Sequence, residues 1–230
     1  MNIFEEQVEI LKTNRSMIGP AVYDKYDFPV ITNQFDSKMD WNNLYPVNLQ
    51  NAAPSASNSN KILLMFRYDR QLESLWNAPL KKVCLFKSYA AVSTPDYSIY
   101  PSMNRNEIRH NIFKNRWLGH LWQNMGVTVY PSVGWGSPDT YDMCFSAIEE
   151  GSVVVISTLG CLQNEEFFLE GYEEMLNRIK PSIVIVYGNL IPGMKGKILN
   201  FKYQESLKKD YVQPNLPGIA RLMTLEGGIA

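Results

Sequence analysis

Histidine and cysteine are scarce in this chain of 230 residues, which has two histidines and three cysteines. His110 and His120 fall on one expected helix, and their ten-residue separation turns their side chains about 80° apart. Cys84, Cys144 and Cys161 are odd in number and lack the Cys-x-x-Cys spacing of redox and zinc sites. The sequence therefore argues against a disulfide scaffold, a closed zinc site and a serine–histidine–aspartate triad, and we expect no metal and no cofactor.

A strong net charge, a long apolar run and a phosphate-binding loop are also missing. The formal net charge is −1, so the whole chain has no general attraction to nucleic acid. No apolar run approaches the ~18 residues of a membrane span, and the N-terminus is acidic and amphipathic, unlike a signal peptide. Neither G-x-x-x-x-G-K-[S/T] nor G-x-G-x-x-G after a strand occurs. We expect no membrane partner, and a reducing cytoplasm as the location.

What the chain does contain is an alternation of apolar runs and amphipathic helices after residue 60. This pattern predicts an α/β fold with a mostly parallel sheet and crossover helices. The sheet could form an incomplete (β/α) barrel or an open doubly wound sheet; the barrel is favoured because each strand ends in a polar or aromatic turn. The expected strands are 61–66, 82–86, 127–133, 152–157 and 182–187, and the expected helices are 71–76, 105–125, 139–149 and one that Asn164 caps.

The whole chain, 1–230, is expected to form a single α/β domain in three parts. Residues 1–60 form an N-terminal helix within 3–13 and an irregular segment, in which 27–31 is a possible strand and 51–60 is the clearest loop. Residues 61–190 form the β/α core. Residues 191–230 form a hairpin from Gly193 onwards and a C-terminal tail.

Five short segments carry a resemblance to a known family: P-D-Y-S at 95–98, N-R-W-L-G at 115–119, P-S-V-G-W at 131–135, V-I-S-T-L-G at 155–160 and V-Y-G at 186–188. As a set they resemble DUF4417, a family of phage and mobile-element proteins described as a domain of unknown function. The resemblance covers roughly residues 25–190. It implies a bacterial or phage origin and a single α/β domain, and it brings no catalytic residues to carry over.

Candidate site residues follow the expected strands. Because the carboxyl ends of parallel strands meet at one edge, Asp96, Trp135, Thr158 and Tyr187 are expected to open onto one cleft. Asp139 is a second candidate carboxylate, although an acid in the first turn of a helix is explained by the helix dipole alone. The remaining candidates for contact with a substrate are Tyr97 and Arg116; a surface ion pair is the ordinary explanation for Arg116.

With metal sites, phosphate-binding loops and a histidine triad excluded, the remaining reactions are those that need only carboxylates, aromatic rings and arginine. Hydrolysis of an N-glycosidic bond in nucleic acid fits, with Asp96 as the essential carboxylate and Trp135 or Tyr97 holding an unstacked base. Arg116 would steady a flanking phosphate. The alternative is a non-catalytic module that binds a nucleotide, nucleic acid or protein in phage–host conflict. Either protein would act in the cytoplasm of a bacterial host.

Overall fold

The computed structural model describes residues 14–15, 19–159, 161, 164–203 and 222–225. The N-terminal helix expected within 3–13 lies outside these residues. The strands are β1 (Tyr45–Asn48), β2 (Lys61–Leu64), β3 (Ala91–Ser93), β4 (Val129–Tyr130), β5 (Val153–Ser157), β6 (Ile183–Tyr187), β7 (Gly196–Phe201) and β8 (Leu222–Leu225). The helices are α2 (Asp69–Asn77), α3 (Val83–Phe86), α4 (Arg105–Asn124), α5 (Tyr141–Cys144) and α6 (Glu165–Ile179), with 3₁₀ turns η1 (Trp41–Asn43), η2 (Leu49–Asn51), η3 (Ala56–Asn60) and η4 (Pro138–Thr140).

The strands lie side by side in the order in which the chain makes them. One sheet has the order β1-β2-β3-β4 and the other β5-β6-β7-β8, and every neighbouring pair is parallel except β7 with β8. A parallel bridge between Ser132 and Val155 joins β4 to β5, with Val133 N donating to Val155 O at 2.9 Å. This order confirms the α/β prediction and is that of a (β/α) barrel, because a doubly wound sheet reverses its order at a switch point.

The two sheets curl around a shared apolar interior. In a flat sheet β2 and β6 would stand four strand spacings apart, about 19 Å. Phe66, just after β2, nevertheless stacks on Tyr187 at the end of β6 with ring centroids 5.0 Å apart. Leu222 N in β8 donates to Asn42 Oδ1 in η1 at 3.1 Å, so the far edge returns towards the start of the sheet. No described residues pair β8 with β1, so the barrel is incomplete.

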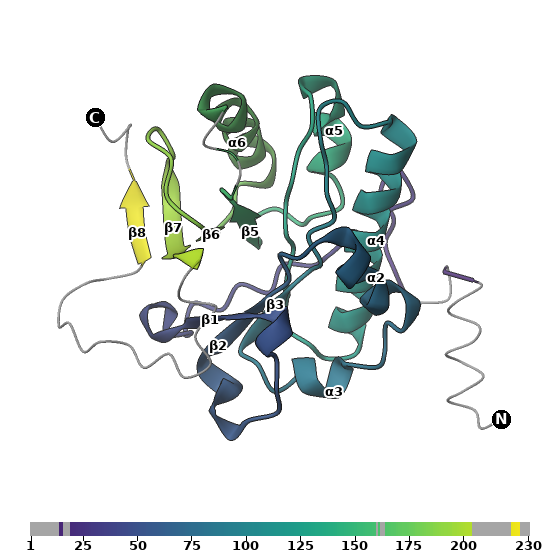
Figure 1. Cartoon of the computed structure of the whole chain (residues 1–230), viewed down its shortest axis with the longest axis vertical. Helices are drawn as coiled ribbons and strands as arrows, with labels where there is room; N and C mark the ends of the chain where they lie inside the picture. Colours follow the sequence, from purple (N-terminus) through teal and green to yellow (C-terminus); the bar gives the residue numbers. More distant parts are fainter. Residues whose placement is uncertain (1–13, 16–18, 160, 162–163, 204–221, 226–230) are drawn as a thin grey trace.

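The helices cover the outer face of this curl. Figure 1 shows α6, α5 and α4 along the upper and right-hand sides, with the strands below and to the left of them. α4 packs on Val92 and Val129, and α6 packs on Val154 and Val184. Apolar residues on both faces of each strand are needed, because one face meets the helices and the other fills the interior.

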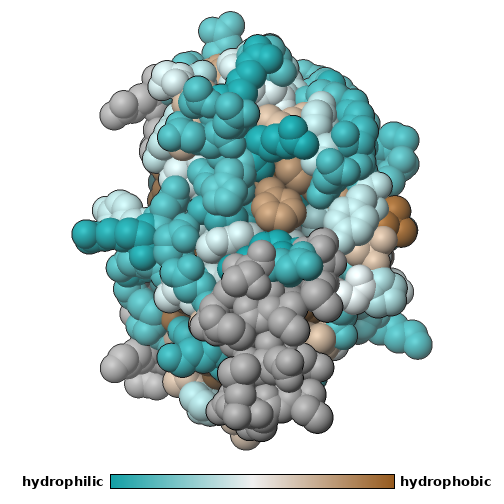
Figure 2. Space-filling model, turned by 90° about the vertical axis from the view of Figure 1, so that its right-hand side faces the viewer, coloured by the Kyte–Doolittle hydropathy of each residue, from teal (hydrophilic) through white to brown (hydrophobic). Residues whose placement is uncertain are grey.

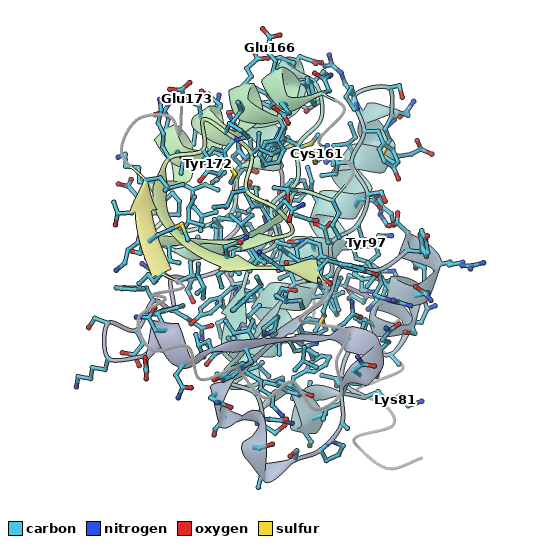
Figure 3. The ribbon with its side chains drawn as sticks, turned by 60° about the vertical axis from the view of Figure 1, so that its left-hand side comes forward. Lys81, Tyr97, Cys161, Glu166, Tyr172 and Glu173 are labelled. Atoms are coloured by element: carbon cyan, nitrogen blue, oxygen red, sulfur yellow. The ribbon has the colours of Figure 1, made fainter. Side chains whose placement is uncertain are left out.

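Of the predicted helices, α6 agrees most closely with its prediction, because it begins directly after Asn164, the residue expected to cap it. The Asn164 side chain caps it by accepting from Phe167 N at 3.4 Å. Figure 3 shows Tyr172 on its inner side, with Glu166 and Glu173 pointing outwards. The acidic residues in its first turn suit the positive end of the helix dipole.

The predicted strand at 82–86 is wrong. These residues form α3, in which Val83 and Phe86, three apart, are buried while Cys84 is exposed. A short apolar run fits one helical turn as well as a strand, and the strand at this place in the sheet is β3.

Other boundaries differ from the predictions because tertiary contacts decide them. The strand expected at 127–133 is reduced to β4, and the helix expected at 139–149 ends at Cys144. Segment 27–31 makes isolated bridges at Pro29 and Ile31 instead of a strand, and the loop at 51–60 contains η3. The segment expected to form a hairpin from Gly193 onwards instead contains the single strand β7, which pairs parallel with β6 and antiparallel with β8, a strand in the expected tail. β1, which contains Pro46, was not predicted.

Candidate functional site

The carboxyl ends of β3 and β4 carry the polar side chains of the candidate site. Asp96 follows β3, and its backbone N–H donates to Met65 O at 3.2 Å, which holds Asp96 beside the end of β2. Ser132 follows β4 in the bridge to β5. Both residues therefore reach the edge of the sheet where the ends of parallel strands meet.

A buried hydrogen-bond network ties this edge to α4. Asn115 Nδ2 donates to Ser132 Oγ and to Pro95 O, both at 2.9 Å. Ser132 N donates to Thr94 Oγ1 at 2.7 Å, and the two hydroxyl oxygens lie 3.2 Å apart. Thr94, Asn115 and Ser132 are all buried. Because buried polar groups are costly unless hydrogen-bonded, these bonds hold the two strand ends in one arrangement.

The pKa of the Asp96 carboxyl is raised to about 7. Burial is the main cause, the negative charge of Asp69 adds to it, and a hydrogen bond from the Ser132 side chain partly opposes it. Asp69 is itself held by Ser98, whose N–H and hydroxyl donate to Asp69 Oδ1 at 3.1 and 3.0 Å. A carboxyl with this pKa is present in both protonation states near neutral pH, as a general acid or base requires.

Arg116 is buried beside this network, so the surface ion pair considered for it is absent. Its guanidinium donates to Cys144 O at 2.7 Å, Ser146 O at 3.1 Å and Asn115 Oδ1 at 2.6 Å. Burial lowers its pKa to about 10, which leaves it cationic at neutral pH. Among the residues that the structure describes, no carboxylate lies within ion-pair distance of it. These three bonds satisfy part of the donor capacity of the guanidinium and hold the buried cation in place.

Asp96 and Arg116 line the same small pocket. Its volume of about 10 Å³ is close to the smallest space that holds one water molecule. The side chains of Asp96, Asn115 and Ser132 line it and could form the hydrogen bonds that a buried water molecule needs. The lining residues are Asp96, Tyr97, Ile99, Asn111, Ile112, Asn115, Arg116, Ser132, Gly134 and Cys144.

Tyr97 lines the pocket and has little surface free for stacking. Its side chain is 4% exposed, and its hydroxyl donates to Leu72 O at 3.3 Å. The Lys114 ammonium lies 3.9 Å from the ring centroid and pairs with Glu73 at 2.7 Å. Burial raises the pKa of the Tyr97 hydroxyl, so it stays protonated.

Trp135, Thr158 and Tyr187 do not line this pocket. The Trp135 ring packs against Phe168, with centroids 5.1 Å apart, and against Gly171, where a Cβ would lie 2.2 Å from the ring. Thr158 is buried and donates to the Asn189 carbonyl at 2.7 Å. Tyr187 is fully buried in its stack on Phe66. The structure therefore does not bring the four expected side chains to one cleft.

Asp139 lies apart from Asp96. It is exposed, in the first turn of η4, and forms an ion pair with Arg105. A hydrogen bond from Ser137 and the charge of Arg105 lower its pKa. Asp139 does not line the pocket that Asp96 lines, so the structure does not bring the two candidate carboxylates together, and a catalytic role for Asp139 stays a prediction.

Sequence reasoning missed Asn111, Asn115 and Ser132. The two asparagines lie four residues apart on α4, which places them on one face of the helix. Asn111 Nδ2 donates to Ser98 O at 2.8 Å, while Asn115 joins the network around Ser132. Amides at this spacing on a helix expected to pack on a sheet were the available signal, since buried polar side chains need partners.

The described residues lack two features that would point to other functions. They contain no cluster of three or more histidine, cysteine, aspartate or glutamate side chains that could hold a metal ion. They also contain no helix that combines the length and the apolar character needed to cross a membrane.

Comparison with known proteins places the chain in a family. The family model for the domain of unknown function DUF4417 matches residues 24–204, which include every residue of the pocket. The chain belongs to this family. The match extends beyond the resembling segments to β7, so the family covers the curled sheet from β1 to β7.

Relatives of this DUF4417 protein occur in mycobacteriophages. It is 33% identical over 151 residues to the Gene 1 protein of Mycobacterium phage D29, a match that covers 64% of this chain and 56% of the relative. It is also 33% identical over 138 residues to the Gene 1 protein of Mycobacterium phage L5, covering 59% and 60%. The chain thus spans less than two thirds of these curated relatives. No solved structure matches it. These matches make it a phage-type protein.

Proposed function

We propose that this phage-type protein hydrolyses an N-glycosidic bond in nucleic acid, with Asp96 as its essential carboxylate. The observation that carries the proposal is a carboxyl of pKa about 7 that lines a cavity of one-water size. Such a group holds and activates water at neutral pH. The cavity has no room for a sugar, so the substrate would lie at its mouth, with the water behind it.

The proposed reaction uses the ionised form of Asp96. The carboxylate takes a proton from the water, and the water oxygen bonds to the anomeric carbon of the sugar. The bond to the base breaks, and the base leaves with the electron pair and takes up a proton. The carboxylate also stabilises the positive charge that develops on the sugar. Arg116 would act from inside the pocket, where its buried positive charge would attract a flanking phosphate of the strand.

The second candidate is the non-catalytic module. Its support is that Arg116, Asn115 and Ser132 already have protein partners, so the network can be purely structural. A protein of this kind would bind a nucleotide, nucleic acid or protein without changing it. In both cases the proposed place of action is the cytoplasm of the bacterial host.

The test is release of base from modified phage DNA, unmodified DNA and RNA, measured as abasic sites. Asp96→Asn should lower the release rate at least about 100-fold, the usual worth of a general acid or base. Asp139→Asn is the matched control, because it removes an exposed carboxylate outside the pocket, and it should release base at the wild-type rate. Equal rates for wild type and Asp96→Asn, or no release from any substrate, would leave the binding module as the better proposal.

A further inference from the structure

A second hollow lies on the outer side of α4, away from Asp96. Its volume is about 290 Å³, close to the lower end of the range of small-molecule pockets. Its helix residues are Asn106, Arg109, His110 and Phe113, whose spacing of three and four places them on one face of α4. Figure 2 looks onto the side of the molecule that carries α2 and α4, and shows apolar side chains near its centre among hydrophilic ones.

The opposite wall is the turn from Asp24 to Phe28, which is held firmly in place. Asp24 Oδ1 accepts from Tyr26 N at 2.8 Å and from Phe28 N at 2.9 Å. Arg109 Nη2 donates to Tyr26 O at 3.0 Å and so ties the turn to α4. The hollow is therefore formed before any ligand arrives, which lowers the entropic cost of binding.

The polar side chains that line the hollow have hydrogen-bond donors and acceptors that no described residue uses. Arg109 uses one N–H group on Tyr26, which leaves the rest of its guanidinium available. The side chains of Asn106, His110 and Asp27 have no hydrogen-bond partner among the described residues, and all are exposed. They offer donors and acceptors beside a fixed positive charge.

Aromatic rings supply the apolar part. Phe113 and Tyr26 are partly buried and line the hollow, and Phe28 lies beneath with its ring centroid 5.7 Å from that of Tyr26. Trp76 supports the other side, packing edge-on against Phe113 and His110 with centroids 6.0 and 6.1 Å away. Flat apolar walls next to donors, acceptors and an arginine suit a planar heterocycle that carries an anionic group.

We propose that this hollow binds one nucleotide. The base stacks on Phe113 and Tyr26, Arg109 binds the phosphate, and Asn106, His110 and Asp27 form hydrogen bonds with the base edge. The nucleotide is either free or part of a single strand, and both present the same base and phosphate. This site is independent of any reaction at Asp96, so it can exist whether or not the proposed hydrolysis occurs.

The test is calorimetric titration of the protein with purine and pyrimidine 5′-monophosphates, the matching nucleosides and inorganic phosphate. Monophosphates should bind more tightly than nucleosides, and phosphate should bind weakest. Arg109→Gln should weaken monophosphate binding about tenfold or more, since a hydrogen bond to a charged group contributes about 1.5–3 kcal/mol. Arg105→Gln is the matched control, because Arg105 lies one turn earlier on α4 and pairs with Asp139 outside the hollow.

Arg109 also holds the turn, so a second variant separates binding from folding. Asn106→Ala removes a side chain with no protein partner and should weaken base binding while leaving the melting temperature unchanged. A short single-stranded oligonucleotide distinguishes the sources: tighter binding than the monophosphate, lost with Arg109→Gln, indicates a nucleotide within a strand, and equal binding indicates a free one. Asp96→Asn should bind as wild type. No binding of any probe at millimolar concentration, or binding that survives both Arg109→Gln and Asn106→Ala, would overturn the proposal.

Discussion

The two halves of the curled sheet, β1–β4 and β5–β8, differ in the side chains at the carboxyl ends of their strands. In the first half, β3 and β4 have three and two residues, and their ends carry the Asp96 pocket and its buried polar network. In the second half, β5 and β6 have five residues each, and the side chains at their ends, Thr158 and Tyr187, are buried in packing. Regular strand pairing is therefore shorter in the half of the sheet where the buried polar groups lie.

Packing beneath the helices shows the same contrast. α6 lies close to Trp135 because Gly171 has no side chain, and the contact is apolar throughout. α4 instead buries Asn111, Asn115 and Arg116, which donate hydrogen bonds to the loop after β3, to Ser132 after β4 and to the end of α5. The packing beneath α6 is therefore apolar, whereas the first half of the sheet holds Asp96, whose carboxyl can change its charge near neutral pH.

The largest effect should come from Asp96 as a function of pH. Its pKa in the folded protein, about 7, lies above the ordinary 3.8, so the stability it contributes is present below pH 4 and is lost as the pH rises through 7. The free energy of unfolding of Asp96→Asn relative to wild type should therefore rise between pH 4 and pH 8, by up to about 4 kcal/mol. Urea unfolding of both proteins across this range measures it.

Asp139→Asn again serves as the control. Its carboxyl has a lowered pKa, so its contribution is lost only as the pH falls towards the acidic range, and its difference from wild type should stay flat above pH 5. Parallel stability curves for Asp96→Asn and wild type would show that the Asp96 pKa is ordinary, and the contrast between the two halves would lose its main support.

A smaller effect should come from adding one methyl group under each helix. Gly171→Ala places a Cβ 2.2 Å from the rigid Trp135 ring and should cost about 2–3 kcal/mol. Gly119→Ala meets the ends of Ile31 and Thr94 at 2.6 and 2.7 Å; the Ile31 side chain can turn away, whereas Thr94 is held by Ser132 N, so the cost should be about 1–2 kcal/mol. Thermal unfolding compares the two, and an equal or larger loss at Gly119 would reverse the assignment of the rigid half.

The smallest effect should come from Thr158→Val, which keeps the shape of the side chain and removes its hydrogen bond to Asn189 O. The expected loss is about 1 kcal/mol of folding stability. Base release and nucleotide binding should be unchanged, because Thr158 lines neither pocket. A loss of activity with intact folding would extend the candidate site into the second half.

The sequence by itself determined the elements whose patterns are long or pure. α4 and α6 carry apolar stripes over 20 and 15 residues, and β5 and β6 are almost entirely β-branched and apolar, so local periodicity suffices to place them. It also predicted that Asp96 follows a strand, but from the apolar run at 82–86, which is helical; the strand that precedes Asp96 is β3.

The tertiary structure alone decided which of the candidate side chains meet. Arg116 is buried because the chain after η4 presents the carbonyls of Cys144 and Ser146 to it, and Trp135 is buried because Gly171 lets α6 approach. The helical form of 83–86 and the curl that brings Phe66 onto Tyr187 also depend on partners far along the chain. Burial and pKa are set by neighbours in space, whereas helix and strand patterns are set largely by neighbours in sequence.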